Sequence, residues 1–87
     1  EAPVLKACGQ SDAGRAGICW EGCPGGSGYE ILVCADQYGS YQLLDVCDNT
    51  QRDYSVPAEY QNCWFKVRAL FCDGDIKGNC SKAVRAG

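Results

Sequence analysis

Eight cysteines in a chain of 87 residues constrain the fold more than any other feature of this sequence. An even number of cysteines in so short a chain is typical of small secreted domains held together by disulfide bonds. So short a chain buries only a small core, and cross-links that each contribute about 2–4 kcal/mol would offset that shortage. We therefore predict a single secreted, extracellular, cysteine-rich domain, residues 1–87. The predicted disulfide residues are Cys8, Cys19, Cys23, Cys34, Cys47, Cys63, Cys72 and Cys80.

The spacing of the cysteines argues against a metal site or a redox-active pair. Zinc ligands come in short-spaced pairs, usually two of them, whereas this chain has one such pair, Cys19 and Cys23, and no histidine. A thioredoxin-like redox pair has two residues between its cysteines, and here there are three. We expect no metal, no cofactor, and separate distant partners for Cys19 and Cys23. Eight cysteines allow 105 pairings, so their connectivity stays open.

The charge pattern excludes one class of partner. The net charge is −3 and the eight basic residues are scattered singly, so we expect no binding to nucleic acid. No apolar run approaches the ~20 residues that span a bilayer, and whether the protein acts on a membrane stays open. The chain starts at Glu1 and contains no methionine, from which we expect a processed mature form.

Local patterns predict strands and helices in a mixed order. Strands are expected at 3–8, 29–35, 41–48 and 76–84. One helix is expected from Ala13 to Glu21, capped by Ser11 or Asp12, and a second from Pro57 to Gly74. The second helix is inferred from apolar residues at helical spacing: Tyr60, Cys63, Trp64, Val67, Leu70 and Phe71. This order predicts an α+β fold, a small disulfide-rich split β-α-β sandwich in which two helices cover one face of an antiparallel sheet.

The residues offer little for catalysis. Without histidine, no Ser-His-Asp arrangement can be built. Paired acids of the kind glycosidases use can be drawn from Glu21 with Glu30, or Asp36 with Asp45, but acids on strand ends and loops are usually solvated. We therefore expect no enzyme, with no catalytic residues. Asn79-Cys80-Ser81 fits the pattern of an N-glycosylation site, and its use stays open.

Four aromatic residues in or beside predicted loops are the candidate binding residues. They are Trp20, Tyr38, Tyr41 and Tyr54. Tyrosine and tryptophan are the side chains most often found at the energetic centre of protein interfaces. For Trp20 the alternative is a place in the small core under the sheet.

Several of these features together resemble the alpha subunit of the type-six killer toxin encoded by viruses of smut fungi, and related secreted proteins of plant-pathogenic fungi. The resemblance runs from about Cys8 to Cys80 and depends on Cys19-Trp20-Glu21-Gly22-Cys23, the eight spread cysteines, the split β-α-β order and the late helix running into Cys72. It implies a secreted fungal α/β sandwich with four disulfides and no catalytic activity or cofactor, acting with a second chain. The toxin's apolar N-terminal segment has no convincing counterpart here, because Glu1 to Lys6 is too short.

Two binding functions follow. The first is a non-enzymatic killer toxin-like or effector protein, antimicrobial or a virulence factor, whose rigid surface binds a cell-surface or apoplastic target on a competing microbe or a host plant. The second is a secreted protease inhibitor that presents a disulfide-braced loop, with Arg15 or Arg52 offered to the enzyme. The sequence leaves open the target, the oligomeric state and the need for a partner chain.

Overall fold

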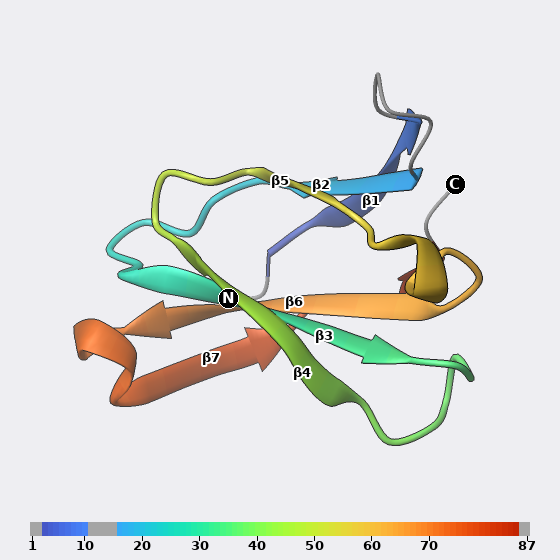
Figure 1. Ribbon diagram of the computed structural model, residues 1–87. Helices are drawn as coiled ribbons and strands as arrows, with labels where there is room; N and C mark the ends of the chain where they lie inside the picture. Colours follow the sequence, from blue (N-terminus) through green and yellow to red (C-terminus); the bar gives the residue numbers. More distant parts are fainter. Residues whose placement is uncertain (1–2, 11–15, 86–87) are drawn as a thin grey trace.

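The computed structural model describes residues 3–10 and 16–85, with the backbone alone at 9–10, and it is built from strands. A three-stranded sheet has the order β1-β2-β5, with β1 at Leu5–Gln10, β2 at Ala16–Trp20 and β5 at Asp53–Ser55. A five-stranded sheet has the order β4-β3-β6-β7, and β8 also pairs with β6. Its strands are β3 (Gly28–Cys34), β4 (Gln42–Asp48), β6 (Trp64–Phe71), β7 (Ile76–Cys80) and β8 (Val84–Arg85). All pairings are antiparallel, and the sheets lie as two layers (Figure 1).

The core lies between the two sheets and is filled by every second residue of the strands. Successive side chains of a strand point to opposite faces, so one face of each strand can be apolar. The core residues include Ile18 and Trp20 from β2, with Val56 after β5. From the five-stranded sheet come Tyr29, Ile31 and Val33 of β3 and Phe65, Val67 and Ala69 of β6.

The predicted α+β fold is wrong, and so are its two helices on one face of a sheet. The helical structure of the described residues is limited to two short 3-10 turns, Ala58–Tyr60 and Cys72–Gly74. Most of the second predicted helix is instead strand β6. In β6 the buried residues Phe65, Val67 and Ala69 alternate with the partly exposed Lys66 and Arg68. Apolar residues on both faces of a strand can recur at helical spacing. Here the segment forms a strand because β6 pairs with β3 on one side and with β7 and β8 on the other.

The first predicted helix is also replaced by a strand over the part that the structure describes. Ala16, Ile18 and Trp20 of β2 are buried, which is the alternation of a strand. Ser11, Asp12 and Ala13, which were to begin the helix, lie outside the described residues. Two glycines at 14 and 17 already weaken a helix here.

The connection from β6 to β7 explains why Gly74 was wrongly predicted to end a helix. Gly74 was expected to end the helix, but it belongs to a tight turn in which Cys72, Asp73 and Gly74 have φ of 54°, 56° and 94°. Glycine adopts such left-handed angles without a steric penalty. The residue marks the end of β6 and the start of a hairpin. Within the described residues, no helix is long and apolar enough to cross a membrane.

Candidate functional site

The loop between β3 and β4, residues 35–41, carries the most exposed aromatic side chain among the large apolar residues of the described chain. Tyr38 is 92% exposed. The loop is braced from within, because the amide of Gly39 donates to the carbonyl of Asp36 over 3.2 Å and the hydroxyl of Tyr41 donates to the carbonyl of Gln37 over 2.8 Å. Tyr38 therefore projects from a loop that is braced by two internal hydrogen bonds.

Lys66 of β6 braces the same loop from the sheet. Its ammonium lies 4.5 Å from the centre of the Tyr41 ring, which is the geometry of a cation–π contact. Burial raises the pKa of Tyr41, and the neighbouring Cys34 adds to this rise. Tyrosine is protonated at neutral pH in any case, and the rise extends to higher pH the range over which Tyr41 can donate to Gln37.

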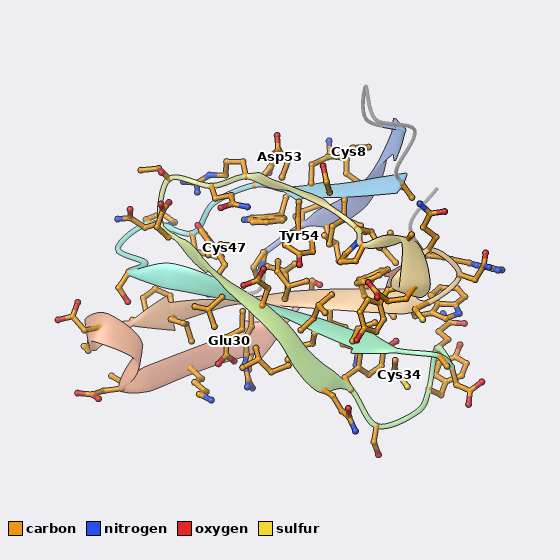
Figure 2. All side chains as sticks on the ribbon, in the orientation of Figure 1. Cys8, Glu30, Cys34, Cys47, Asp53 and Tyr54 are labelled. Atoms are coloured by element: carbon orange, nitrogen blue, oxygen red, sulfur yellow. A yellow bond between two sulfur atoms is a disulfide. The ribbon has the colours of Figure 1, made fainter. Side chains whose placement is uncertain are left out.

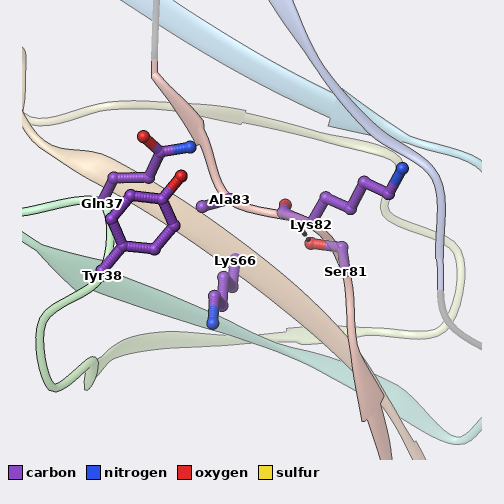
Figure 3. A pocket seen from close by; sticks show the side chains of 6 residues that line it. All are labelled: Gln37, Tyr38, Lys66, Ser81, Lys82 and Ala83. Atoms are coloured by element: carbon purple, nitrogen blue, oxygen red, sulfur yellow. Dashed lines mark hydrogen bonds between the residues drawn. The ribbon is translucent and has the colours of Figure 1, made fainter.

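A cavity of about 310 Å³ opens beside Tyr38. Its lining residues are Gln37, Tyr38, Lys66, Ser81, Lys82 and Ala83. Figure 3 shows Gln37 and Tyr38 on one side and the segment of Ser81, Lys82 and Ala83 on the other, with the two lysine ammonium groups pointing in different directions. We call these six residues together with Tyr41 the Tyr38 surface. Two lysines and no acid line the cavity, so it is locally basic in a chain of net charge −3.

The floor of the Tyr38 surface is held rigidly by Ser81. The Ser81 side chain is 4% exposed, and its hydroxyl accepts the amide of Val67 over 3.0 Å and donates to the carbonyl of Lys82 over 3.1 Å. The amide of Ser81 donates to the carbonyl of Val67 over 2.8 Å. These bonds fix the segment after β7 against β6, which sets the position of Lys82 relative to Lys66. Ser81 is also the hydroxyl of the possible glycosylation site, whose Asn79 is exposed on β7.

The structure brings together two of the four predicted binding residues. Tyr38 and Tyr41 share one loop. Trp20 lies in the core, 3% exposed and 5.6 Å from Tyr29 between ring centres, as the core alternative for this residue expects; its Nε1 has no hydrogen-bond acceptor among the described residues. Tyr54 of β5 packs against the core and donates its hydroxyl to Asp45 over 3.0 Å, away from the Tyr38 surface.

Sequence reasoning missed the polar half of this surface. Lys66 falls within the predicted helix from Pro57 to Gly74, and neither it nor Gln37 or Lys82 was predicted as a binding residue. A strand pattern over 64–71 would have placed Lys66 on the face opposite Phe65 and Val67, which is the available signal. Nothing in the sequence brings Lys82 next to a loop more than forty residues earlier, because that contact depends on the pairing of β6 with both β3 and β7.

The cysteines fall into bonded and unbonded groups. A disulfide joins Cys8 of β1 to Cys19 of β2, so the partner of Cys19 lies on the adjacent strand. The thiols are Cys34, Cys47, Cys63, Cys72 and Cys80. Cys23 is half-buried, and its amide donates to the hydroxyl of Tyr29. Bonding of all eight cysteines stays a prediction. No three Cys, Asp or Glu side chains gather into a possible metal site within residues 3–10 and 16–85.

Two of the four acids considered for catalysis, Glu30 and Asp45, are engaged in other contacts. Glu30 is 6% exposed, and its carboxylate accepts a hydrogen bond from Arg68 Nε over 2.6 Å and lies 3.3 Å from Lys77 Nζ (Figure 2). Asp45 accepts the hydroxyl of Tyr54 and, through its other oxygen, the amide of Val46. The hydrogen bonds and charges of Arg68 and Lys77 favour the charged form of Glu30.

Of the two arginines proposed for protease inhibition, only Arg52 lies within the described residues. Arg15 lies outside the described residues. Arg52 is folded back: its Nη1 donates to the carbonyls of Asn49 and Gln51, and its guanidinium lies 5.3 Å from the centre of the Tyr29 ring. An inhibitory loop presents an extended side chain, and Arg52 does not have that arrangement.

Comparison with known proteins supports the fold. No protein-family model matches the chain, and no curated protein matches its sequence significantly. A solved Fn3-like protein from Clostridium thermocellum is similar, with a TM-score of 0.68 and 14% identity over 94% of this chain and 82% of that one. The pectate lyase Pel3 from Pectobacterium carotovorum is similar over 93% of this chain and 26% of its own length, with a TM-score of 0.67 and 13% identity. Neither match bears on the killer-toxin resemblance; both agree with the two-layered, β-sandwich-like fold of this chain.

Proposed function

We propose that this protein is a secreted, non-enzymatic binding protein that acts as a killer toxin-like or effector molecule through the Tyr38 surface. The observation that supports this most is Tyr38 itself, a large aromatic ring that is 92% exposed on a braced loop. A rigid aromatic side chain loses little conformational entropy when it binds, so it is an efficient contact.

The surroundings of Tyr38 indicate the chemistry of the partner. Lys66 and Lys82 line the cavity with their ammonium groups pointing in different directions, that of Lys66 over the Tyr41 ring, and Gln37 adds an amide. Such a surface suits a partner that inserts an apolar or ring-shaped group and carries negative charge around it. The target we propose is therefore an acidic group on a cell surface or an apoplastic protein.

Growth inhibition and cell binding test the proposal. The protein is applied to fungal and plant cells, and its binding is measured with a fluorescent label. We expect Tyr38→Ala to lower binding at least tenfold while the folded structure stays intact, because an exposed side chain contributes little to stability.

Ile76→Ala is the matched control for this experiment. Ile76 is 55% exposed, and it pairs with Phe71 at the end of β6 that is remote from Trp64 and the Tyr38 loop. This variant should bind like the unchanged protein. Equal binding by Tyr38→Ala, or binding lost equally in both variants, would refute the role of the Tyr38 surface.

A further inference from the structure

We propose that Cys34 and Cys63 form a disulfide bond that fastens the start of the Tyr38 loop to β6. Cys34 is the last residue of β3, and it pairs with Trp64, the first residue of β6. Cys63 directly precedes Trp64. Directly opposite residues of an antiparallel pair lie about 4.5–5.5 Å apart between Cα atoms, so the Cα atom one residue along is about 6 Å away, which is within the usual span of a disulfide. Successive side chains of a strand alternate between its faces, and Cys63 lies in the bend before β6, so the bend has to turn the Cys63 sulfur toward Cys34.

The two cysteines also share a cavity. They lie on its wall together with Val33, Ala35, Ser40, Gln42 and Tyr60, and it measures about 300 Å³. Both side chains are partly exposed, so a small oxidant can reach them. Figure 2 places Cys34 at the end of β3, where the loop that carries Tyr38 begins.

The thiols of Cys47, Cys72 and Cys80 lie too far away to compete for Cys34. Cys47 pairs with Tyr29, five residues from Cys34 along β3, which is about 17 Å at the rise of a strand. Cys80 pairs with Arg68, four residues from Trp64, or about 13 Å. Cys72 follows the far end of β6. Cys8 and Cys19 are already joined in the other sheet.

The loop is shaped around the Cys34 sulfur. A Cβ at Gly39 would lie 2.6 Å from Cys34 Sγ, so the absence of a side chain at Gly39 makes room for that sulfur under the loop. A covalent bond from Cys34 to Cys63 would anchor the loop to the strand that supplies Lys66. The anchored loop would then present Tyr38 in one conformation.

The bond forms by thiol–disulfide exchange with a small disulfide oxidant such as oxidised glutathione. One thiolate attacks the oxidant to give a mixed disulfide and releases one glutathione thiol; the second thiolate displaces the other. Two protein thiols are oxidised, one glutathione disulfide is reduced to two thiols, and the protein loses two hydrogens.

Peptide mapping of the full chain tests the inference. The protein is equilibrated in a glutathione redox buffer, its remaining thiols are blocked with N-ethylmaleimide, and it is digested with chymotrypsin without reduction. Cleavage after Leu32, Tyr38, Tyr60 and Trp64 releases VCADQY and QNCW, each with a single cysteine. We expect these two peptides joined by a bond that disappears on reduction.

Single variants supply the control and do not require cell binding. In Cys34→Ser the maleimide should newly label Cys63, whereas Cys72→Ser, which removes an exposed cysteine remote from the pair, should leave the joined peptides unchanged. Labelling of both Cys34 and Cys63 in the oxidised wild-type chain, or either peptide joined to another cysteine, would overturn the inference. Because the readout is a mass, its failure is distinct from failure of the Tyr38 surface to bind.

Discussion

Replacement of Glu30 by glutamine probes the one buried charge cluster described in the sandwich. Glu30 lies between Tyr29 and Ile31, whose side chains face the core, so its own side chain lies on the outer face of the five-stranded sheet. It is nevertheless only 7% exposed, because Arg68 from β6 and Lys77 from β7 cover it. Three neighbouring strands are thus joined through one carboxylate.

The magnitude follows from the two contacts. The bond from Arg68 Nε to Glu30 is 2.6 Å long and largely buried, and a charge-assisted hydrogen bond of this kind is worth about 1.5–3 kcal/mol, roughly twice a neutral one. Lys77 is 51% exposed at 3.3 Å, and such pairs contribute at most about 1 kcal/mol. Glu30→Gln keeps an acceptor but loses the charge, so we expect a loss of about 1–2 kcal/mol. That corresponds to a fall in Tm of roughly 5–15 °C.

Urea unfolding followed by tryptophan fluorescence, from the buried Trp20 and the partly buried Trp64, measures this loss. A double-mutant cycle with Arg68→Met should give a coupling energy of about 1 kcal/mol, whereas Lys77→Met alone should cost less than that. A loss below about 0.5 kcal/mol for Glu30→Gln, or an unchanged loss in the Arg68→Met background, would refute the reasoning.

The same cluster predicts how stability depends on pH. Burial alone would raise the pKa of Glu30, but the hydrogen bonds and charges of Arg68 and Lys77 outweigh it and lower the pKa below 4.5. A group with a lowered folded-state pKa stabilises the protein above its unfolded pKa, and that stability is lost as the pH falls through the folded value. The wild type should therefore lose more stability than Glu30→Gln between about pH 6 and about pH 3.

The remaining predictions concern the core, a tyrosine and the disulfide. Phe65→Ala should cost about 3–5 kcal/mol in urea unfolding, because the ring is fully buried; a loss below about 1 kcal/mol would contradict the strand assignment of β6. Burial and the Asp45 carboxylate raise the pKa of Tyr54 from 10.0 to about 12, so its contribution to stability should decline as the pH rises from 10 through 12, and Tyr54→Phe should lack this decline in an alkaline unfolding series. Cys8→Ser should lower the free energy of unfolding by about 3 kcal/mol, since the bond to Cys19 closes a loop over a sequence separation of 11. Chemical reduction of the wild-type protein should lower it by at least as much.

Part of the fold could be predicted from the sequence because some segments show the pattern of a strand and no competing pattern of a helix. The segment YEILVC, rich in β-branched and aromatic residues, was predicted as a strand and forms β3, and QLLDVCD forms β4. The segment WFKVRALF carries two signals, a helical stripe through Val67 and Leu70 and an alternation through Phe65, Val67 and Ala69. Periodicity alone does not separate them, because both Leu70 and Val67 are buried, on opposite faces of the sheet.

The candidate site was half predictable for a related reason. Exposure of Tyr38 follows from its place in a short, mostly polar loop that contains Asp36, Gly39 and Ser40, residues typical of turns. In the sequence, Trp20 and Tyr54 also lie in or beside predicted loops, as Tyr38 does. In the structure, Trp20 is part of the core between the sheets and Tyr54 packs against it. Residue type and loop position thus indicate which aromatic side chains could bind a partner. Packing between the sheets determines which of them remain exposed.

By itself the sequence determined that this is a small cysteine-rich chain without histidine, with a strong strand at its centre and an aromatic loop beside it. The tertiary structure decided that β6 is a strand, that Lys66 and Lys82 line one cavity with Tyr38, and that Cys34 lies opposite the start of β6. The physical reason is that strands are stabilised by hydrogen bonds and side-chain contacts to neighbouring strands, which are distant in the sequence, whereas local patterns report only on neighbours along the chain.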